Sequence, residues 1–304
     1  MFGKVLIPLD GSTLAESALE PAFKIAQQQQ SEVILATVPV FHQVLIPGSA
    51  GFGLALPDQT YELCREEAET YLEQVSSTRA MPGLAIRHIV PEGDVAGAIV
   101  DLAIQEQVDL IVMTTHGYSG LSRWMLGSIT ERVLRGAHCP VLVIRCELPF
   151  DRVLITLDGS PLAEQALEPG LELARVFGSR VTLLRVDPGE TLGRIELGLL
   201  EIAGQGLSKP MAEQDRSDRV SHYLDNIAYQ HSKEGMDIET VLLQGAPAGR
   251  ILEYLESNRV DLLVMATHGH TGLRRWVYGS VTQKCLHNST CAMLIVRPPA
   301  EAYH

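Results

Sequence analysis

The chain has 304 residues, of which 46% are hydrophobic and 20% charged, and its formal net charge is −13. This length suffices for two domains of about 150 residues, each with its own core, and the composition is that of a soluble globular protein. The negative charge argues against nucleic acids and anionic membranes as partners. A small anionic ligand is not excluded, because local backbone dipoles decide binding at a buried loop.

Short apolar runs alternate with longer amphipathic ones along the whole chain. In the first half they predict strand 4–9, helix 14–27, strand 33–38, helix 60–78, strand 84–90, helix 95–106, strand 109–113, helix 128–135 and strand 140–145. The second half repeats this order at 152–157, 161–176, 180–186, 211–233, 237–243, 247–257, 261–265, 280–287 and 291–297. Continuous Val, Ile and Leu runs are typical of strands buried on both faces. We therefore expect an α/β fold of two tandem Rossmann-like domains, each a five-stranded parallel sheet with helices on both faces.

The two halves are also similar residue by residue. Segment 4–12 matches 152–160, and segment 115–128 matches 267–280 glycine for glycine. Such a repeat indicates a duplication, which we divide into domains 1–147 and 150–304. The ligands of parallel sheets of this kind bind outside the carboxyl ends of the strands, and we expect a site there in each half.

Several features bear on where the protein works. The five cysteines form no CxxC pair, which fits reduced thiols in the cytoplasm better than disulfides or a zinc site. The first residues run directly into a predicted strand and leave no room for a signal peptide. The apolar stretch 40–56 is interrupted by Pro47, Gly48, Gly51 and Gly53, so we interpret it as a loop and not as a membrane span. Segments 39–59 and 187–210 are either surface insertions or lids over a site.

A glycine-rich loop joins a predicted strand to a predicted helix in each half. Gly117 comes shortly after strand 109–113, and Gly127 and Ser128 open helix 128–135. Glycine lets the backbone approach a phosphate, and the free amide groups at a helix start carry a positive dipole. Gly269, Gly279 and Ser280 repeat this pattern. No Walker motif is present, so the loops predict phosphate sites of another kind.

The chain resembles the universal stress protein family, as a tandem member of its ATP-binding branch, over essentially its whole length. That branch carries the motif Gly-x2-Gly-x9-Gly-Ser/Thr. The last three motif positions are present in both halves, whereas the first glycine is replaced by Thr114 and by Ala266. Threonine is bulkier and stiffer than alanine. We therefore expect the second site to bind more tightly than the first.

The resemblance implies that an aspartate after the first strand of each half, Asp10 or Asp158, accepts hydrogen bonds near the ribose and adenine. The alternative is that this aspartate caps the next helix through an Asx turn. The resemblance also implies that backbone groups of Val38 and Val186 meet the adenine edge. The complete expected sets are Asp10, Val38, Gly93, Met113, Thr114, His116, Gly117, Gly127, Ser128, Ile129 and Thr130 in the first half, and Asp158, Val186, Gly245, Met265, Ala266, His268, Gly269, Gly279, Ser280, Val281 and Thr282 in the second.

The same residues give little support to catalysis. His116 and His268 have no serine or cysteine nucleophile evident beside them, so we interpret them as structural or ligand-lining. His270 is Tyr118 in the other copy, which argues against a metal site. Arg123 and Arg275 either clamp a polyphosphate or are solvated.

We therefore expect a stress-response protein that binds ATP, or else AMP or ADP, as a regulatory and non-catalytic ligand, with Mg²⁺ carried on the phosphates. Two alternatives stay open: a slow ATPase that uses Asp10 or Asp158, and a nucleotide-free, dimeric interaction protein. The resemblance further suggests that the final strands of the two halves pair to form an intramolecular pseudo-dimer, and that the whole chain forms a homodimer. The sequence identifies no regulatory protein partner.

Overall fold

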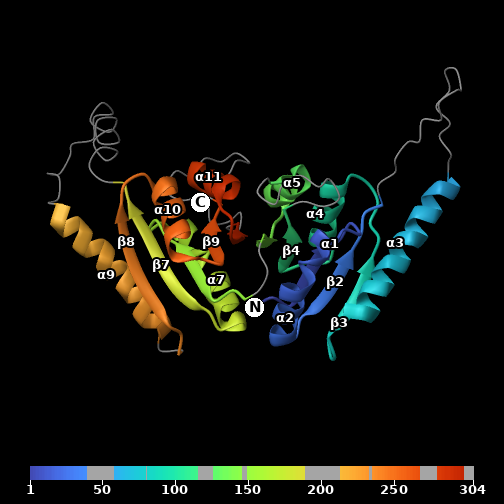
Figure 1. Ribbon diagram of the computed structural model, residues 1–304, viewed down its shortest axis with the longest axis horizontal. Helices are drawn as coiled ribbons and strands as arrows, with labels where there is room; N and C mark the ends of the chain where they lie inside the picture. Colours follow the sequence, from blue (N-terminus) through green and yellow to red (C-terminus); the bar gives the residue numbers. More distant parts are fainter. Residues whose placement is uncertain are drawn as a thin grey trace, which may run out of the picture. The chain divides into compact units, whose positions relative to one another are not determined.

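The computed structural model of the protein describes residues 1–39, 58–79, 81–115, 126–145, 149–188, 213–232, 235–267 and 279–297. The chain divides into two compact units, Met1–Ile144 and Arg145–His304 (Figure 1). Within the described ranges, no helix is both long enough and apolar enough to cross a membrane.

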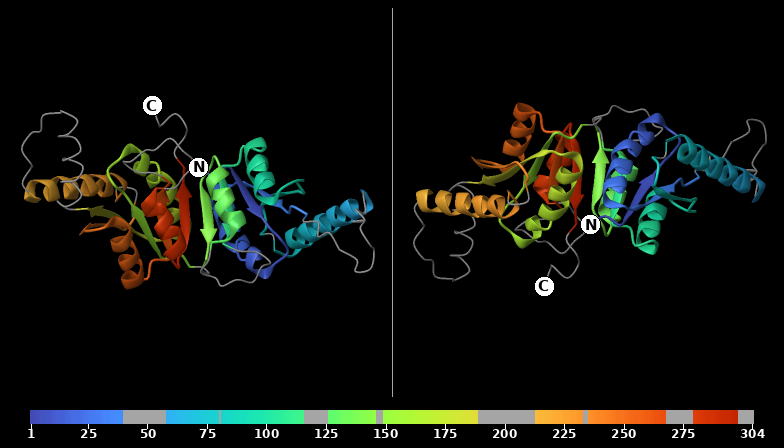
Figure 2. Two further views of the ribbon diagram at one scale, coloured as in Figure 1. Left: turned by 90° about the horizontal axis from the view of Figure 1, so that it is seen from above. Right: turned by 90° about the horizontal axis from the view of Figure 1, so that it is seen from below.

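Unit 1 is a parallel sheet with the strand order β3-β2-β1-β4-β5. Its elements in chain order are β1 (Lys4–Pro8), α1 (Thr13–Glu16), α2 (Leu19–Gln29), β2 (Glu32–Ala36), α3 (Asp58–Arg79), β3 (Ala85–Ile89), α4 (Val95–Gln105), β4 (Leu110–Thr114), α5 (Ser128–Gly136) and β5 (Val141–Ile144). The chain moves from β1 toward β3 and then returns to β4 on the other side of β1. Because such crossovers are right-handed, α2 and α3 cover one face of the sheet. Helices α4 and α5 pack against each other on the opposite face (Figure 2).

Unit 2 repeats this arrangement with the strand order β10-β9-β6-β7-β8. Its elements are β6 (Arg152–Thr156), α6 (Pro161–Glu164), α7 (Leu167–Phe177), β7 (Arg180–Asp187), α9 (Glu213–Ser232), β8 (Ile238–Gln244), α10 (Pro247–Asn258), β9 (Leu262–Ala266), α11 (Ser280–Asn288) and β10 (Ala292–Val296). The predicted fold class and the predicted order of strands and helices are confirmed.

The prediction of one continuous helix at 14–27, and of another at 161–176, is wrong. Each is two helices, α1 with α2 and α6 with α7. The reason is a proline in the second helix of each pair, Pro21 or Pro169. Its ring would collide with the carbonyl group four residues earlier, and it has no N–H to donate to that group. The chain therefore turns between the two helices instead of running straight.

The core lies on both faces of each sheet. Every residue of β4 and of β9 is buried, as continuous apolar strands predict. The contact of α7 with the sheet depends on a glycine. A Cβ atom on Gly170 would lie 2.9 Å from Cδ1 of Ile155 and 3.0 Å from Cγ1 of Val264. Helix α7 therefore lies too close to β6 and β9 to carry a side chain at this position.

This packing gives a stability prediction with a matched control. Alanine at Gly170 would overpack the core at a cost of about 1–3 kcal/mol, partly offset by the better helix propensity of alanine, up to about 1 kcal/mol. Gly249 of α10 has no described atom within 4 Å of its Cβ position, so Gly249→Ala gains propensity without a clash. We expect Gly170→Ala to be less stable than Gly249→Ala by about 1–3 kcal/mol in urea unfolding of unit 2. Equal urea midpoints for the two variants would contradict the close packing of α7 against the sheet.

Candidate functional site

A cavity of about 770 Å³ lies in unit 1 at the carboxyl ends of β1, β2 and β4. This is the edge where the strand order reverses, and there the connections after β1 and β4 leave in opposite directions and open a crevice. The cavity brings together segments from distant parts of the chain. The sequence-predicted residues that line it are Asp10, Val38, Met113, Thr114, Gly127, Ser128, Ile129 and Thr130.

The start of α5 forms one wall of this cavity. Gly127 is the N-cap residue of the helix and makes no side-chain cap hydrogen bond. The N–H groups of the first turn, on Ser128, Ile129 and Thr130, have no partner within the helix, and all three residues line the cavity. The structure therefore presents a helix N-terminus with its positive dipole to the cavity, an arrangement suited to an anion.

Short hydrogen bonds hold this helix start against the end of β4. The N–H of Gly127 donates to the carbonyl oxygen of Thr115 over 2.8 Å. The buried hydroxyl of Thr130 donates to the carbonyl oxygen of Thr114 over 2.9 Å and to that of Thr115 over 3.1 Å. The position of the helix N-terminus is thus set by the strand.

Asp10 takes part in a turn and also lines the cavity. Its Oδ1 atom accepts hydrogen bonds from the N–H of Ser12 at 3.0 Å and from the Ser12 hydroxyl at 2.6 Å. The N–H donation is the Asx turn considered from the sequence. The helix cap itself is the Ser12 hydroxyl, which accepts from the N–H of Ala15. The turn holds the Asp10 carboxylate at the carboxyl edge of the sheet.

Sequence reasoning missed part of the cavity wall. Thr37, directly after β2, lines the cavity, and its buried Oγ1 atom has no hydrogen-bond partner among the described residues. Cys64, Glu67, Ala68 and Tyr71 of α3 also line it. One sequence signal for this part of the wall is a repeated tyrosine, because Tyr71 of one half recurs as Tyr223 of the other.

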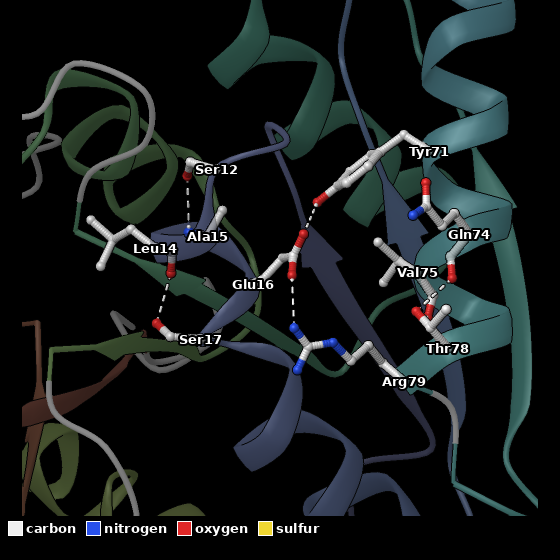
Figure 3. Close-up of polar contacts among 10 residues, drawn as sticks. All are labelled: Ser12, Leu14, Ala15, Glu16, Ser17, Tyr71, Gln74, Val75, Thr78 and Arg79. Atoms are coloured by element: carbon white, nitrogen blue, oxygen red, sulfur yellow. Dashed lines mark hydrogen bonds and ion pairs between the residues drawn. The ribbon is translucent and has the colours of Figure 1, made fainter.

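Tyr71 connects α3 to α1 through Glu16 (Figure 3). Its hydroxyl donates to Oε1 of Glu16 at 3.2 Å, and the guanidinium group of Arg79 contacts Oε2 of the same carboxylate at 3.3 Å. Burial of the ring, followed by the negative charge of Glu16, raises the pKa of Tyr71 well above its ordinary value. The phenol therefore stays protonated and remains a hydrogen-bond donor.

Unit 2 repeats these local arrangements. The N–H of Gly279 donates to Thr267, and the hydroxyl of Thr282 donates to the carbonyl oxygen of Ala266 at 2.9 Å. Tyr223 donates to Oε1 of Glu164 at 2.8 Å. The other predicted residues at the carboxyl edge are Asp158, which accepts from Ser160, Val186 near the end of β7, Met265 in β9, and Ser280 and Val281 at the start of α11.

Gly93 and Gly245 occupy turns before α4 and α10, with φ angles of 114° and 126° that favour glycine. Gly93 does not line the cavity of unit 1, although Val95 does. His116, Gly117, His268 and Gly269 lie outside the described residues, as do Arg123 and Arg275. In the described part of the chain, no group of three or more His, Cys, Asp or Glu side chains is placed to hold a metal ion.

The two Tyr–Glu contacts predict a pH dependence. Burial, together with the neighbouring glutamate, raises the pKa of Tyr71 and of Tyr223. Above about pH 10 the unfolded chain loses phenol protons that the folded protein keeps, so the free energy of unfolding falls as the pH rises. We expect the double variant Tyr71→Phe, Tyr223→Phe to lose stability less steeply than the parent in urea unfolding at alkaline pH. Tyr229→Phe, on a side chain 66% exposed, should keep the parent's slope, and equal slopes for all three proteins would disprove the effect.

Comparison with known proteins agrees with this architecture. The family model of the universal stress protein family matches residues 1–145 and again residues 149–297. A universal stress protein of Methanocaldococcus jannaschii is 37% identical over 48% of the chain and 83% of its own length. A universal stress protein of Mycolicibacterium smegmatis is 25% identical over 97% of both chains. The crystal structure of a universal stress protein from Archaeoglobus fulgidus superimposes with a TM-score of 0.69 at 20% identity and covers 98% of this chain and 99% of that one. The chain belongs to the universal stress protein family, with two family domains in tandem.

Proposed function

We propose that unit 1 binds an adenine nucleotide, ATP in the first place, as a regulatory ligand. The observation that carries the proposal is a single cavity that joins an open helix N-terminus to a carboxylate held at the neighbouring strand end. Its volume of about 770 Å³ is within the range of small-molecule sites, roughly 300–1,000 Å³. Phosphates suit the wall formed by the helix N-terminus, and ribose hydroxyls suit the wall that carries the carboxylate.

The remaining walls fit a nucleoside. Ile99 and Met113 give apolar surface, and the half-buried ring of Tyr71 adds an aromatic face. The hydroxyl of Thr37, which has no hydrogen-bond partner in the described part of the chain, would gain one from a polar base edge or a ribose. In this proposal Asp10 and Thr37 orient the nucleoside, while Ser128, Ile129 and Thr130 hold the phosphates. Mg²⁺ would bind with the phosphates.

We propose a binding role rather than turnover for Asp10. The two hydrogen bonds that its Oδ1 atom accepts from Ser12 fix the orientation of the carboxylate, as a group that positions a ligand requires. A single-turnover assay with purified full chain and ATP distinguishes the two roles. Stoichiometric binding of ATP without release of phosphate supports the regulatory role. Release of one phosphate for each occupied site supports the slow ATPase.

Substitutions at the start of α5 test the site directly. Valine at Gly127 places a branched side chain at the helix start, so Gly127→Val should abolish ATP binding in unit 1. Ser128→Ala removes a donor to a charged group, worth about 1.5–3 kcal/mol, and should weaken binding roughly 10- to 150-fold. Titration calorimetry with magnesium present measures both effects.

Ser77→Ala is the matched control, because Ser77 is an exposed serine of α3 whose hydroxyl donates to the carbonyl oxygen of Gln74 in the same helix. It should bind as the parent does. Circular dichroism shows whether each variant keeps its fold. If folded Gly127→Val binds ATP, ADP and AMP with the parent's affinities, the site is wrongly placed.

Small molecules released from freshly purified protein give an independent measurement. We expect mass spectrometry to detect ATP, or ADP or AMP in its place, at a level that falls in Gly127→Val. Protein that carries no nucleotide and binds none in titration would favour the nucleotide-free interaction protein instead.

A further inference from the structure

The two units differ at the glycine that follows each ligand-edge aspartate. Gly11 and Gly159 have nearly the same φ angles, 82° and 81°, and each precedes the serine that caps the next helix. Gly11 lines the cavity, and no described atom lies within 4 Å of its Cβ position. At Gly159 the same position lies 2.4 Å from Nη1 and 2.9 Å from Cζ of Arg185. A space that is open in unit 1 is therefore occupied by a guanidinium group in unit 2.

Arg185 and Thr37 are equivalent positions of the two sheets. Ala36 pairs with Pro8 in unit 1, and Leu184 pairs with Thr156 in unit 2. The carbonyl groups of Ala36 and Leu184 accept the next N–H of the neighbouring strand, at 2.7 Å and 2.9 Å. Thr37 and Arg185 directly follow these residues. The short, cavity-lining threonine of one unit is thus a long, cationic side chain in the other.

The guanidinium group of Arg185 is held in this position by its neighbours. Its Cζ atom lies 5.4 Å from the ring centroid of Tyr223, a favourable cation–π distance. The Tyr223 ring is fixed in turn by its hydrogen bond to Glu164. The charges of Asp158 and Arg185 both act on Tyr223, with opposite effects on its pKa. Arginine, tyrosine and aspartate therefore converge where unit 1 has its cavity.

We propose that Arg185 closes the second site to nucleotides, so that the chain binds one adenine nucleotide, in unit 1. The inference rests on the function proposed above and adds the stoichiometry and the residue that sets it. A nucleoside entering unit 2 displaces the guanidinium group from Gly159 and from the Tyr223 ring, and the lost cation–π contact weakens binding by up to about 30-fold. This order of affinities is the reverse of the one that Thr114 and Ala266 suggest.

Exchanging the two residues tests the proposal. Titration calorimetry of full chain with ATP and magnesium should give one nucleotide per chain for the parent. Arg185→Thr should open the second site and give two, and Thr37→Arg should close the first and give none.

Arg180→Thr is the matched control, because Arg180 lies at the amino end of β7, is 58% exposed and pairs with Asp237 away from the carboxyl edge. It should keep one nucleotide per chain. Two equal sites in the parent, or one site in a folded Arg185→Thr variant, overturn the role of Arg185 and leave nucleotide binding intact. A parent that binds no nucleotide overturns the proposed function itself, and this inference with it.

Discussion

The candidate site depends on one hydrogen bond, from the hydroxyl of a first-turn threonine to the carbonyl group at the end of the strand that precedes its helix. In unit 1 this bond joins Thr130 to Thr114, and in unit 2 it joins Thr282 to Ala266. Both threonines are buried, so a missing partner would leave polar groups unsatisfied, at a cost of about 1–3 kcal/mol. The bond places the helix N-terminus beside the strand end, whatever path the intervening loop takes. The proposed phosphate site at this edge of the sheet therefore rests on the anchoring of the helix as much as on the glycines.

The sequence predicts most of the framework because its signals are local. Buried parallel strands are continuous apolar runs, and each run that predicts a strand in one half recurs at the equivalent position of the other half. The aspartate, the helix-opening glycine and the serine lie next to strand ends, so the topology alone brings Asp10, Gly127 and Ser128 to one edge. The helix breaks were missed for an equally local reason. Pro21 fits the amphipathic pattern of one long helix, although its ring excludes the carbonyl group four residues before it.

The rest could not be read from the sequence because it depends on contacts between distant segments. The repeat of Tyr71 as Tyr223 marks the position, but it does not indicate that Tyr71 reaches Glu16, a residue from the start of the chain, or that it lines a cavity with Thr37. Likewise Arg185 looks like an ordinary polar residue near the end of a strand. Only the fold shows that its guanidinium group lies over Gly159, which comes from a different strand connection.

The two halves have kept what the fold requires and changed what a ligand would meet. The threonine anchor, the capping serine and the Tyr–Glu contact occur in both units. Arginines instead lie beside the turn glycines of unit 2. Besides Arg185 at Gly159, the side chain of Arg250 lies 3.3 Å from the Cβ position of Gly245, whereas the same position of Gly93 in unit 1 has no described atom within 4 Å. The strands and the threonine anchor are the same in both units, whereas the surroundings of the turn glycines differ. The fold of a duplicated domain can therefore be retained while the groups at the carboxyl edge of one sheet change.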